Sequence, residues 1–290
     1  MIFVSTGGFA NSDAATTVKK LSETGINSFE LSGGKYKEHL YEELREMRES
    51  FFLQVHNYFP PPKEPFVLNL ASLDNDNAVK SIKHVKKAIE WANDIGQSIY
   101  SFHSGFLLDP KVSELGKKVQ TRELFDRHDS LSYFIERVND LDKFAKNHGV
   151  KLLIENNVLS ANNYERFSSD PFLMTNSEEC IKVMKSTSDN VELLIDVAHL
   201  KVSSNSLGFN PVKFLKDCEN WIRAYHLSDN DGATDSNDPI SKRSWFLPHL
   251  KTDLEYYSLE IYGISNDKII EQYNLLESYL NNNRKNELDR

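Results

Sequence analysis

The stretches KLLIENN (residues 151–157) and ELLIDVAH (residues 192–199) share one pattern, a short apolar run that ends on an acidic residue. Such runs are typical of the buried strands of a parallel sheet. Along the chain, short runs of this kind alternate with longer amphipathic segments, which predicts βα units. The eight predicted strands are residues 2–5, 28–31, 52–56, 99–103, 151–155, 192–196, 222–226 and 257–261.

The segments between the predicted strands carry apolar residues at three- and four-residue spacing, as amphipathic helices do. Predicted helices include residues 14–23, 36–49, 77–93, 132–148, 177–185 and 268–280. Eight such units predict an α/β protein with a single (β/α)₈ TIM barrel. The alternative is a doubly wound open sheet, which more often has a glycine-rich phosphate turn after its first strand. Ser5-Thr6-Gly7-Gly8 is too short for that turn and lacks its third glycine.

The length of the chain suits one domain. Its 290 residues would fit one barrel of about 250 residues with long connections. No linker-like stretch interrupts the series of units, so we predict one barrel domain over residues 1–280. Residues 281–290 are polar and rich in asparagine, and we expect them to form a C-terminal tail that frays.

The charge balance argues against two classes of partner. With 34 Lys and Arg against 43 Asp and Glu, the formal net charge is −9, which works against nucleic-acid backbones and anionic membranes. No apolar run approaches the roughly 20 residues of a membrane span, and no charged segment precedes Ile2-Phe3-Val4. We therefore expect a cytoplasmic protein. Cys180 and Cys218 form no CxxC pair and are predicted to be small buried hydrophobes.

Ionisable side chains close the predicted strands. Because the carboxyl ends of barrel strands meet at one mouth, these side chains should converge there. A buried isolated charge is very costly, and one divalent cation would compensate several such groups together. Mixed carboxylates and imidazoles suit Zn²⁺, Mn²⁺, Co²⁺ or Mg²⁺. The residues are Glu30, His56, His103, Glu155, Asp196 and His226 at or near strand ends, and Glu260 within the last strand.

The long connections add further candidates. Arg166 and Lys242 lie in them and could anchor substrate anions, although a solvated charge is the ordinary role of such residues. Apolar residues at 58–62 and 244–246 leave core packing, a sugar-stacking wall and a contact between subunits of a homo-oligomer as alternatives.

Seven motifs resemble one family when they are taken together. They are VHN (55–57), NLAS (69–72), SFHSG (101–105), IENN (154–157), IDVAH (195–199), HLSD (226–229) and LE (259–260). Spread over nearly the whole chain, they resemble the xylose isomerase-like TIM-barrel superfamily. That superfamily includes sugar phosphate isomerases and epimerases, and the apurinic endonucleases known as AP endonuclease family 2.

The resemblance implies a metal site. The two Glu, the Asp and the His of the family's shared site correspond to Glu155, Glu260, Asp196 and His226. In the endonuclease branch, further zinc ligands correspond to His56, His103, His199 and Asp235, which implies a second ion at His56 and His103. The histidine expected two residues after Asp235 is Asn237 here, so a third ion is in doubt.

These residues predict a divalent-metal-dependent isomerase or epimerase that acts on a sugar or sugar derivative. The cation would stabilise an enediolate, and Glu155 and Glu260 are the candidate bases. His56, His103 and His199 would bind the small carbohydrate substrate.

Three alternatives stay open. The first is an apurinic-endonuclease-type phosphodiester hydrolase, against which stand the net charge and Asn237. The second is a dehydratase of keto-polyols, since its first proton abstraction is the same. The third is a catalytically silent barrel that binds carbohydrate.

Overall fold

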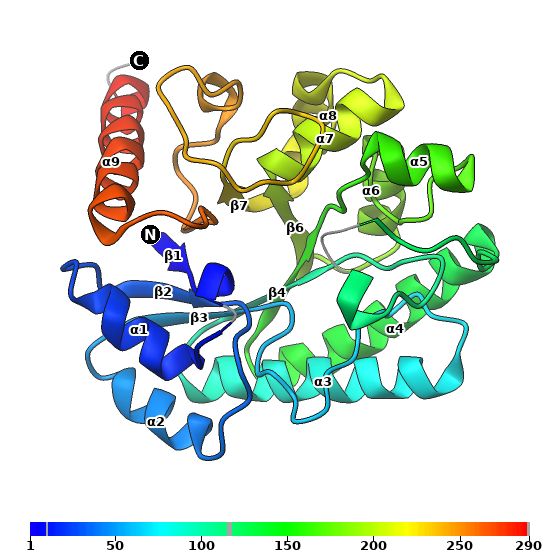
Figure 1. Ribbon diagram of the computed structural model, residues 1–290, viewed down its shortest axis with the longest axis horizontal. Helices are drawn as coiled ribbons and strands as arrows, with labels where there is room; N and C mark the ends of the chain where they lie inside the picture. The colour runs from blue at the N-terminus through cyan, green and yellow to red at the C-terminus, as the bar shows by residue number, and fades with distance from the viewer. Residues whose placement is uncertain (10, 115–117, 289–290) are drawn as a thin grey trace.

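The predicted (β/α)₈ barrel is confirmed. The computed structural model describes residues 1–9, 11–114 and 118–288. Eight parallel strands follow one another around a closed barrel, and β1 pairs with β8 to complete it. Helices surround the strands, and the C-terminal helix lies near the N-terminus of the chain (Figure 1). The strands are β1 (Ile2–Ser5), β2 (Ser28–Leu31), β3 (Phe52–His56), β4 (Ile99–His103), β5 (Lys151–Glu155), β6 (Val191–Asp196), β7 (Ile222–Leu227) and β8 (Tyr256–Leu259).

The first five strands have the predicted bounds, whereas β7 runs one residue further than predicted, to Leu227, and the end of β8 also differs. β8 ends at Leu259, so Glu260 follows the strand instead of lying within it. The Glu260 N–H still donates to the carbonyl of Leu227, at 3.2 Å. This hydrogen bond holds Glu260 at the rim beside the end of β7.

The helices fill the connections between strands. They are α1 (Ala14–Ser22), α2 (Leu40–Met47), α3 (Asn75–Asp94), α4 (Arg127–Asn147), α5 (Ala161–Phe167), α6 (Ser177–Lys185), α7 (Val197–Leu207), α8 (Pro211–Cys218) and α9 (Asn266–Leu288). Short 3₁₀ turns lie at Gly7–Phe9, Val112–Glu114, Glu219–Trp221 and Leu247–His249. α2 is shorter than predicted because the chain before it turns through a left-handed residue, His39, at φ 61°.

The C-terminal helix takes in most of the stretch that the sequence sets apart as a polar tail. α9 is helical through Leu288, and residues 289 and 290 lie outside the described part of the chain. Within that described part, no helix combines the length and the apolar character that a membrane span requires.

Two cores lie on opposite sides of the strands. Leu152 and Ile154 of β5 point outward into the large core shared with the helices, whereas Leu153 points into the barrel. This alternation follows from the two-residue period of a strand. The inner core is a small cluster of Phe3, Leu153, Leu194, Ala224 and Tyr256, with Ile99 against it.

The layer above the inner core is polar. Nearer the carboxyl ends of the strands, the next side chains that point into the barrel are polar. They are Glu30, His56, Glu155, Asp196 and His226, all nearly inaccessible to solvent. A packed barrel usually fills such layers with branched apolar side chains. In this barrel the small inner core fills only the lower layer, and the ionisable groups pack directly above it.

The inner core can be tested by removing Leu194, which is fully buried. Leu194→Ala leaves a cavity beneath the polar layer and should cost about 2–5 kcal/mol of unfolding free energy. Val79→Ala is the matched control because Val79 is 41% exposed, and it should change stability by less than about 0.5 kcal/mol. Urea unfolding followed by circular dichroism measures both. Equal stabilities of the two variants would contradict an inner core of this kind.

Candidate functional site

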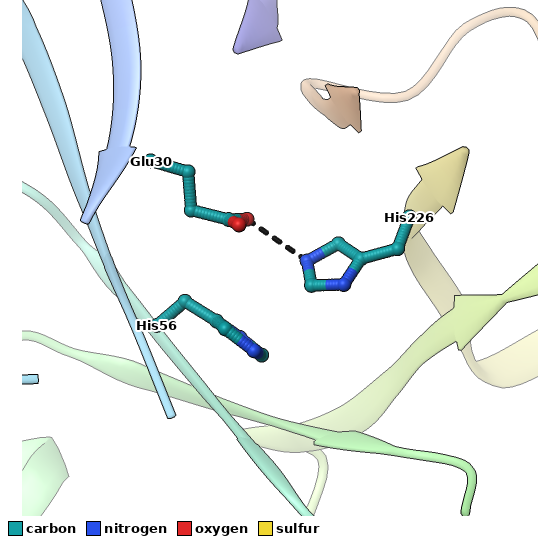
Figure 2. A group of neighbouring side chains, drawn as sticks. All are labelled: Glu30, His56 and His226. Atoms are coloured by element: carbon teal, nitrogen blue, oxygen red, sulfur yellow. Dashed lines mark hydrogen bonds and ion pairs between the residues drawn. The ribbon is translucent and has the colours of Figure 1, made fainter. Parts of the chain in front are cut away.

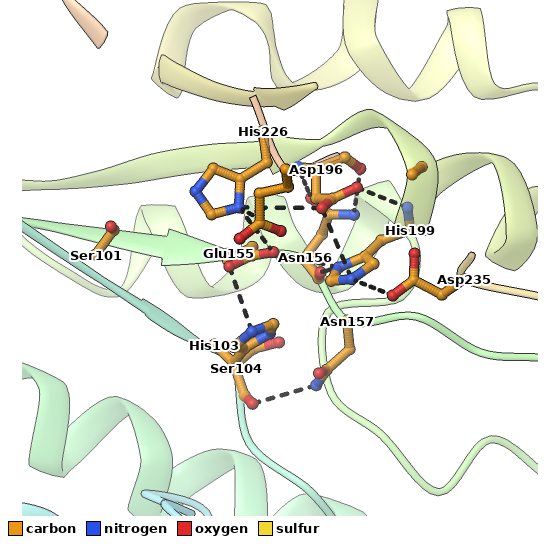
Figure 3. A network of polar contacts seen from close by, with 12 residues as sticks. Ser101, His103, Ser104, Glu155, Asn156, Asn157, Asp196, His199, His226 and Asp235 are labelled. Atoms are coloured by element: carbon orange, nitrogen blue, oxygen red, sulfur yellow. Dashed lines mark hydrogen bonds and ion pairs between the residues drawn. The ribbon is translucent and has the colours of Figure 1, made fainter. Parts of the chain in front are cut away.

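The structure brings the predicted strand-end residues together at one mouth of the barrel. The carboxylates and imidazoles point toward one another from consecutive strands, with Glu155 between His103 and His226 (Figure 3). Glu30, Glu155, Asp196 and His226 are inaccessible to solvent, and the His103 side chain is 26% exposed. Convergence at the carboxyl ends of strands is where barrel enzymes place their chemistry.

One group of ligand atoms surrounds a common centre. Nδ1 of His226 lies 3.5 Å from Oε1 of Glu155, 4.0 Å from Oδ2 of Asp196 and 3.4 Å from Oε2 of Glu260. Glu155, Asp196 and His226 each offer one atom to a cluster within 4.8 Å. Two carboxylates and an imidazole at this spacing match the donor types that divalent cations use.

Several of these atoms have no hydrogen-bond partner among the described residues. They are Oε1 and Oε2 of Glu155, Oδ2 of Asp196 and Nδ1 of His226. Buried polar atoms are normally paired, and an unpaired one costs about 1–3 kcal/mol. A cation at the centre of the group would satisfy Oε1 of Glu155, Oδ2 of Asp196 and Nδ1 of His226, so the donor set fits a divalent metal ion.

Local structure aims Asp196 at this centre. Oδ1 of Asp196 accepts from the His199 N–H at 2.8 Å and caps α7, which leaves Oδ2 free. The side chain of Asn156 pairs with the Asp196 backbone, accepting from its N–H at 2.8 Å and donating to its carbonyl at 3.1 Å. The amide thus ties the end of β5 to the end of β6.

A second group lies beside the first and shares Glu155. Oε2 of Glu155 is 3.3 Å from Nε2 of His56 and 3.5 Å from Nε2 of His103. The three residues form another cluster of ligand atoms. Nδ1 of His56 contacts Oγ of Ser101 at 2.9 Å, so its other nitrogen is the one that faces Glu155. This geometry agrees with the second ion that the sequence suggests, which stays a prediction.

His199 and Asp235 form a pair at the edge of the site. Nε2 of His199 lies 3.2 Å from Oδ2 of Asp235. The side chain of Asn237, two residues further on, accepts from the Ser228 hydroxyl at 3.2 Å. At the position where the endonuclease resemblance expects a ligand, the side chain of Asn237 therefore makes a hydrogen bond within the loop after β7.

Crowded carboxylates shift the pKa values of the group. Burial lowers the pKa of the His226 imidazole, but Glu30, Glu260 and Glu155 more than compensate and raise it well above its ordinary value. Burial raises the pKa of Asp196 to about 7, with Glu155 and Asp235 adding to the effect against the charge of His199. Burial acts against ionisation of Glu260 too, yet the His226 charge lowers the pKa of Glu260 to about 2. The group as a whole favours added positive charge.

A cavity of about 490 Å³ opens above the group. Its polar wall includes His56, His103, His199, Asp235 and Glu260, whereas Glu155, Asp196 and His226 are fully buried and are not among its described lining residues. Of the two candidate bases, Glu260 is the one that faces the cavity. The volume lies within the range of small-molecule sites.

Arg166 and Lys242 do not line this cavity. The Arg166 guanidinium donates to the carbonyl of Val119 at 3.1 Å, which ties α5 to the loop that contains Val119. Lys242 is exposed. Among the described lining residues, the one lysine or arginine is Lys118. Arg166, Lys242 and Lys118 all lie in long connections of the sequence. Their position therefore did not show that, of the three, Lys118 is the one that lines the cavity.

The apolar residues of the long connections have divided roles. Phe59 and Phe246 are fully buried and belong to the outer core. Tyr58 lines the cavity, as do Phe106 and Phe172, whose rings meet edge to face with centroids 5.5 Å apart. Core packing and a wall of the cavity thus account for these residues, and a contact between subunits stays a prediction.

Glu260 is held by residues that the sequence did not single out. Its Oε1 accepts from the hydroxyls of Ser5 and Tyr262, each at 3.2 Å. The Tyr262 ring lies directly against Gly8, where an added Cβ would come within 2.5 Å of the ring. Gly7-Gly8 therefore makes room for Tyr262.

Comparison with known proteins identifies relatives by family model and by fold. Residues 18–248 match the family model described as xylose isomerase-like TIM barrel. No curated protein sequence matches the chain.

Solved structures with the same fold cover almost the whole chain. A D-tagatose 3-epimerase-like protein superposes with a TM-score of 0.73 at 19% identity, covering 98% of each chain. An L-ribulose 3-epimerase gives 0.70 at 14% identity, covering 99% of this chain and 97% of its own. A Thermus thermophilus protein soaked with ZnCl₂ gives 0.63 at 19% identity, covering 96% and 97%. At these identities the likeness shows the fold.

The support of Glu260 can be tested at Gly8. The added methyl of Gly8→Ala should push the Tyr262 ring away and cost about 1–3 kcal/mol of unfolding free energy. In a Tyr262→Ala background the same change should cost much less, because the clashing ring is gone. A double-mutant cycle of urea unfolding measures this coupling. Additive effects would show that Gly8 does not serve to admit Tyr262.

Proposed function

Because the chain belongs to the xylose isomerase-like TIM barrel family, we propose that it is a divalent-metal-dependent isomerase or epimerase of a sugar or sugar derivative. The observation that carries the proposal is the set of unpaired, buried ligand atoms of Glu155, Asp196 and His226 around one centre. The names of the structural neighbours, which include tagatose and ribulose epimerases, support a carbohydrate substrate.

In this proposal Glu155, Asp196, His226 and Glu260 hold one ion, which is Mn²⁺, Co²⁺, Zn²⁺ or Mg²⁺. A second ion would take His56 and His103 together with Oε2 of Glu155, which lies 3.3 and 3.5 Å from their Nε2 atoms. The cation supplies Lewis-acid stabilisation of the negative charge that develops on substrate oxygens. Imidazole donors favour zinc or cobalt, and the carboxylates favour the harder ions.

The protein's own groups then move the proton. Glu260 faces the cavity, so its carboxylate is within reach of a bound substrate. Its Oε1 accepts from the hydroxyls of Ser5 and Tyr262, which fix the direction of the carboxylate that takes the proton from a substrate carbon. Glu155, whose Oε1 lies 3.5 Å from the same Nδ1 of His226, is the candidate to return the proton.

The remaining polar wall orients the substrate. His56, His103 and His199 line the cavity and can bind sugar hydroxyls. Asp235 fixes the ring of His199 at 3.2 Å, so its direction is set before substrate enters. Preorganised groups of this kind lower the cost of reaching the reactive geometry.

Proton abstraction can be detected without knowledge of the product. The protein with Mn²⁺ or Co²⁺ is incubated in D₂O with ketoses such as D-tagatose and L-ribulose, and deuterium uptake at carbon is measured by mass spectrometry. Glu260→Gln and Glu155→Gln should each reduce the exchange rate about 10²–10⁴-fold. Full exchange in both variants would contradict the assignment of the bases. A product lighter by one water would identify a dehydratase instead.

Metal binding should stabilise the fold. Addition of Co²⁺ or Zn²⁺ to chelator-treated protein should raise the free energy of unfolding by about 2.7 kcal/mol at a hundredfold excess over Kd. Asp196→Asn removes one ligand oxygen and should abolish most of this gain. Thermal unfolding with and without metal measures it, and Glu192→Gln, at a buried carboxylate outside the site, is the control. No gain in the wild-type protein would favour a catalytically silent barrel.

A hydrolase of the apurinic-endonuclease type is the second candidate, favoured by the cluster of His56, His103 and Glu155. Against it, the described lining of the cavity holds one basic side chain, Lys118, and the net charge is −9. Incubation with abasic-site duplex DNA and Zn²⁺ distinguishes the two candidates. We expect no nicking above the rate of the metal alone, and prompt nicking that Glu155→Gln abolishes would reverse the ranking.

A further inference from the structure

Glu30 is the strand-end residue whose role the proposed function leaves open. It lies on β2, is fully buried, and is none of the four proposed ligands of the first ion. Oε2 of Glu30 accepts a hydrogen bond from Nε2 of His226 at 2.8 Å (Figure 2). The opposite nitrogen of the same ring, Nδ1, is the one that faces Glu155, Asp196 and Glu260.

We propose that Glu30 is a positioning residue that fixes the His226 ring so that Nδ1, and not Nε2, is presented to the metal ion. The proposal rests on the proposed metal site and deepens it. An imidazole binds a metal through one nitrogen, and the partner of the other nitrogen determines which one that is. With its Nε2 proton held by a carboxylate, His226 has Nδ1 left for the ion.

Glu30 is itself held from below. The hydroxyl of Tyr256 donates to the same Oε2 atom. Tyr256 stands in the inner apolar cluster, where its ring packs edge to face on Phe3 with centroids 5.3 Å apart. The inner apolar cluster therefore fixes the ring of Tyr256, and the Tyr256 hydroxyl binds the carboxylate of Glu30. That carboxylate in turn binds the imidazole of His226.

The same chain of contacts continues to the second group. Oγ of Ser101 lies 3.4 Å from the Tyr256 hydroxyl and 2.9 Å from Nδ1 of His56. His56 thus has its Nδ1 turned toward this polar layer and its Nε2 toward Glu155. Hydrogen bonds on the inner face of the barrel thus orient one histidine of each group of ligand atoms, His226 in the first and His56 in the second. Glu30 is the carboxylate that links Tyr256 to His226 in this chain.

The test compares Glu30→Ala and Glu30→Gln with Glu192→Ala. Glu192 is the matched control because it is also a buried barrel carboxylate, but its partners are Lys151 and Arg223. The first readout needs no metal. In metal-free protein labelled with ¹⁵N-histidine, the hydrogen-bonded Nε2–H of His226 should give a downfield proton resonance, identified by its loss in His226→Asn.

This resonance should disappear in Glu30→Ala, persist at a shifted position in Glu30→Gln, whose amide oxygen can still accept, and remain in Glu192→Ala. Its persistence unchanged in Glu30→Ala would overturn the proposal. Glu30→Gln keeps the size of the side chain, so it reports on the hydrogen bond even if the alanine variant unfolds. A wild-type protein without such a resonance would also overturn the proposal.

The second readout is Co²⁺ binding, followed by visible absorption and calorimetry. Loss of an outer partner of a histidine ligand typically weakens metal binding 10–100-fold. We expect this loss and an altered Co²⁺ spectrum in Glu30→Ala, a smaller loss in Glu30→Gln, and affinity within about twofold of wild type in Glu192→Ala. Wild-type affinity and spectrum in Glu30→Ala would overturn the proposal. If the wild-type protein itself fails to bind Co²⁺, the proposed metal site is wrong, and the metal-free resonance still decides the role of Glu30.

Discussion

Mutual proximity of buried carboxylates and imidazoles is the constraint on which the rest of the site depends. Four different strand ends supply Glu155, Asp196, Glu260 and His226. The three carboxylates each come within about 4 Å of Nδ1 of His226. Closure of the barrel forces this convergence, because no strand can turn its end away without breaking pairing on both sides. The structure therefore concentrates carboxylates in a largely buried region, and a cation is the simple way to balance them.

The barrel meets this electrostatic demand by dividing its interior. The large outer core between strands and helices supplies most of the buried apolar surface, so the small inner core need only support the polar layer. Amides such as Asn156 and hydroxyls such as Tyr256 then orient the ionisable groups one by one. Precision at the mouth comes from these paired contacts, and the loops above shape the cavity.

Much of the fold could be predicted from the sequence because strand signals in a parallel barrel are strong. Apolar runs closed by polar residues placed the first five strands at their observed bounds. The bounds of α2 and the end of β8 were missed, since a left-handed turn at His39 and the loss of regular pairing before Glu260 leave no mark in apolar spacing. Boundaries of elements depend on such local geometry.

The residues of the candidate site could be predicted from the sequence where they lie at the ends of predicted strands. Position at a strand end identified the residues that meet, including Glu30, but it could not separate ligand candidates from their supports. Tyr262 and Tyr256 were missed because their roles depend on contacts between distant strands, and Arg166 and Lys242 were included on loop position alone.

The most direct test of the account is the position of the metal itself. Crystals grown with Zn²⁺ and measured at the zinc absorption edge should show an anomalous peak about 2.0–2.2 Å from Nδ1 of His226 and from carboxylate oxygens of Glu155, Asp196 and Glu260. A peak bound through Nε2 of His226, or the four side chains turned away from a common centre with zinc bound elsewhere, would contradict the account.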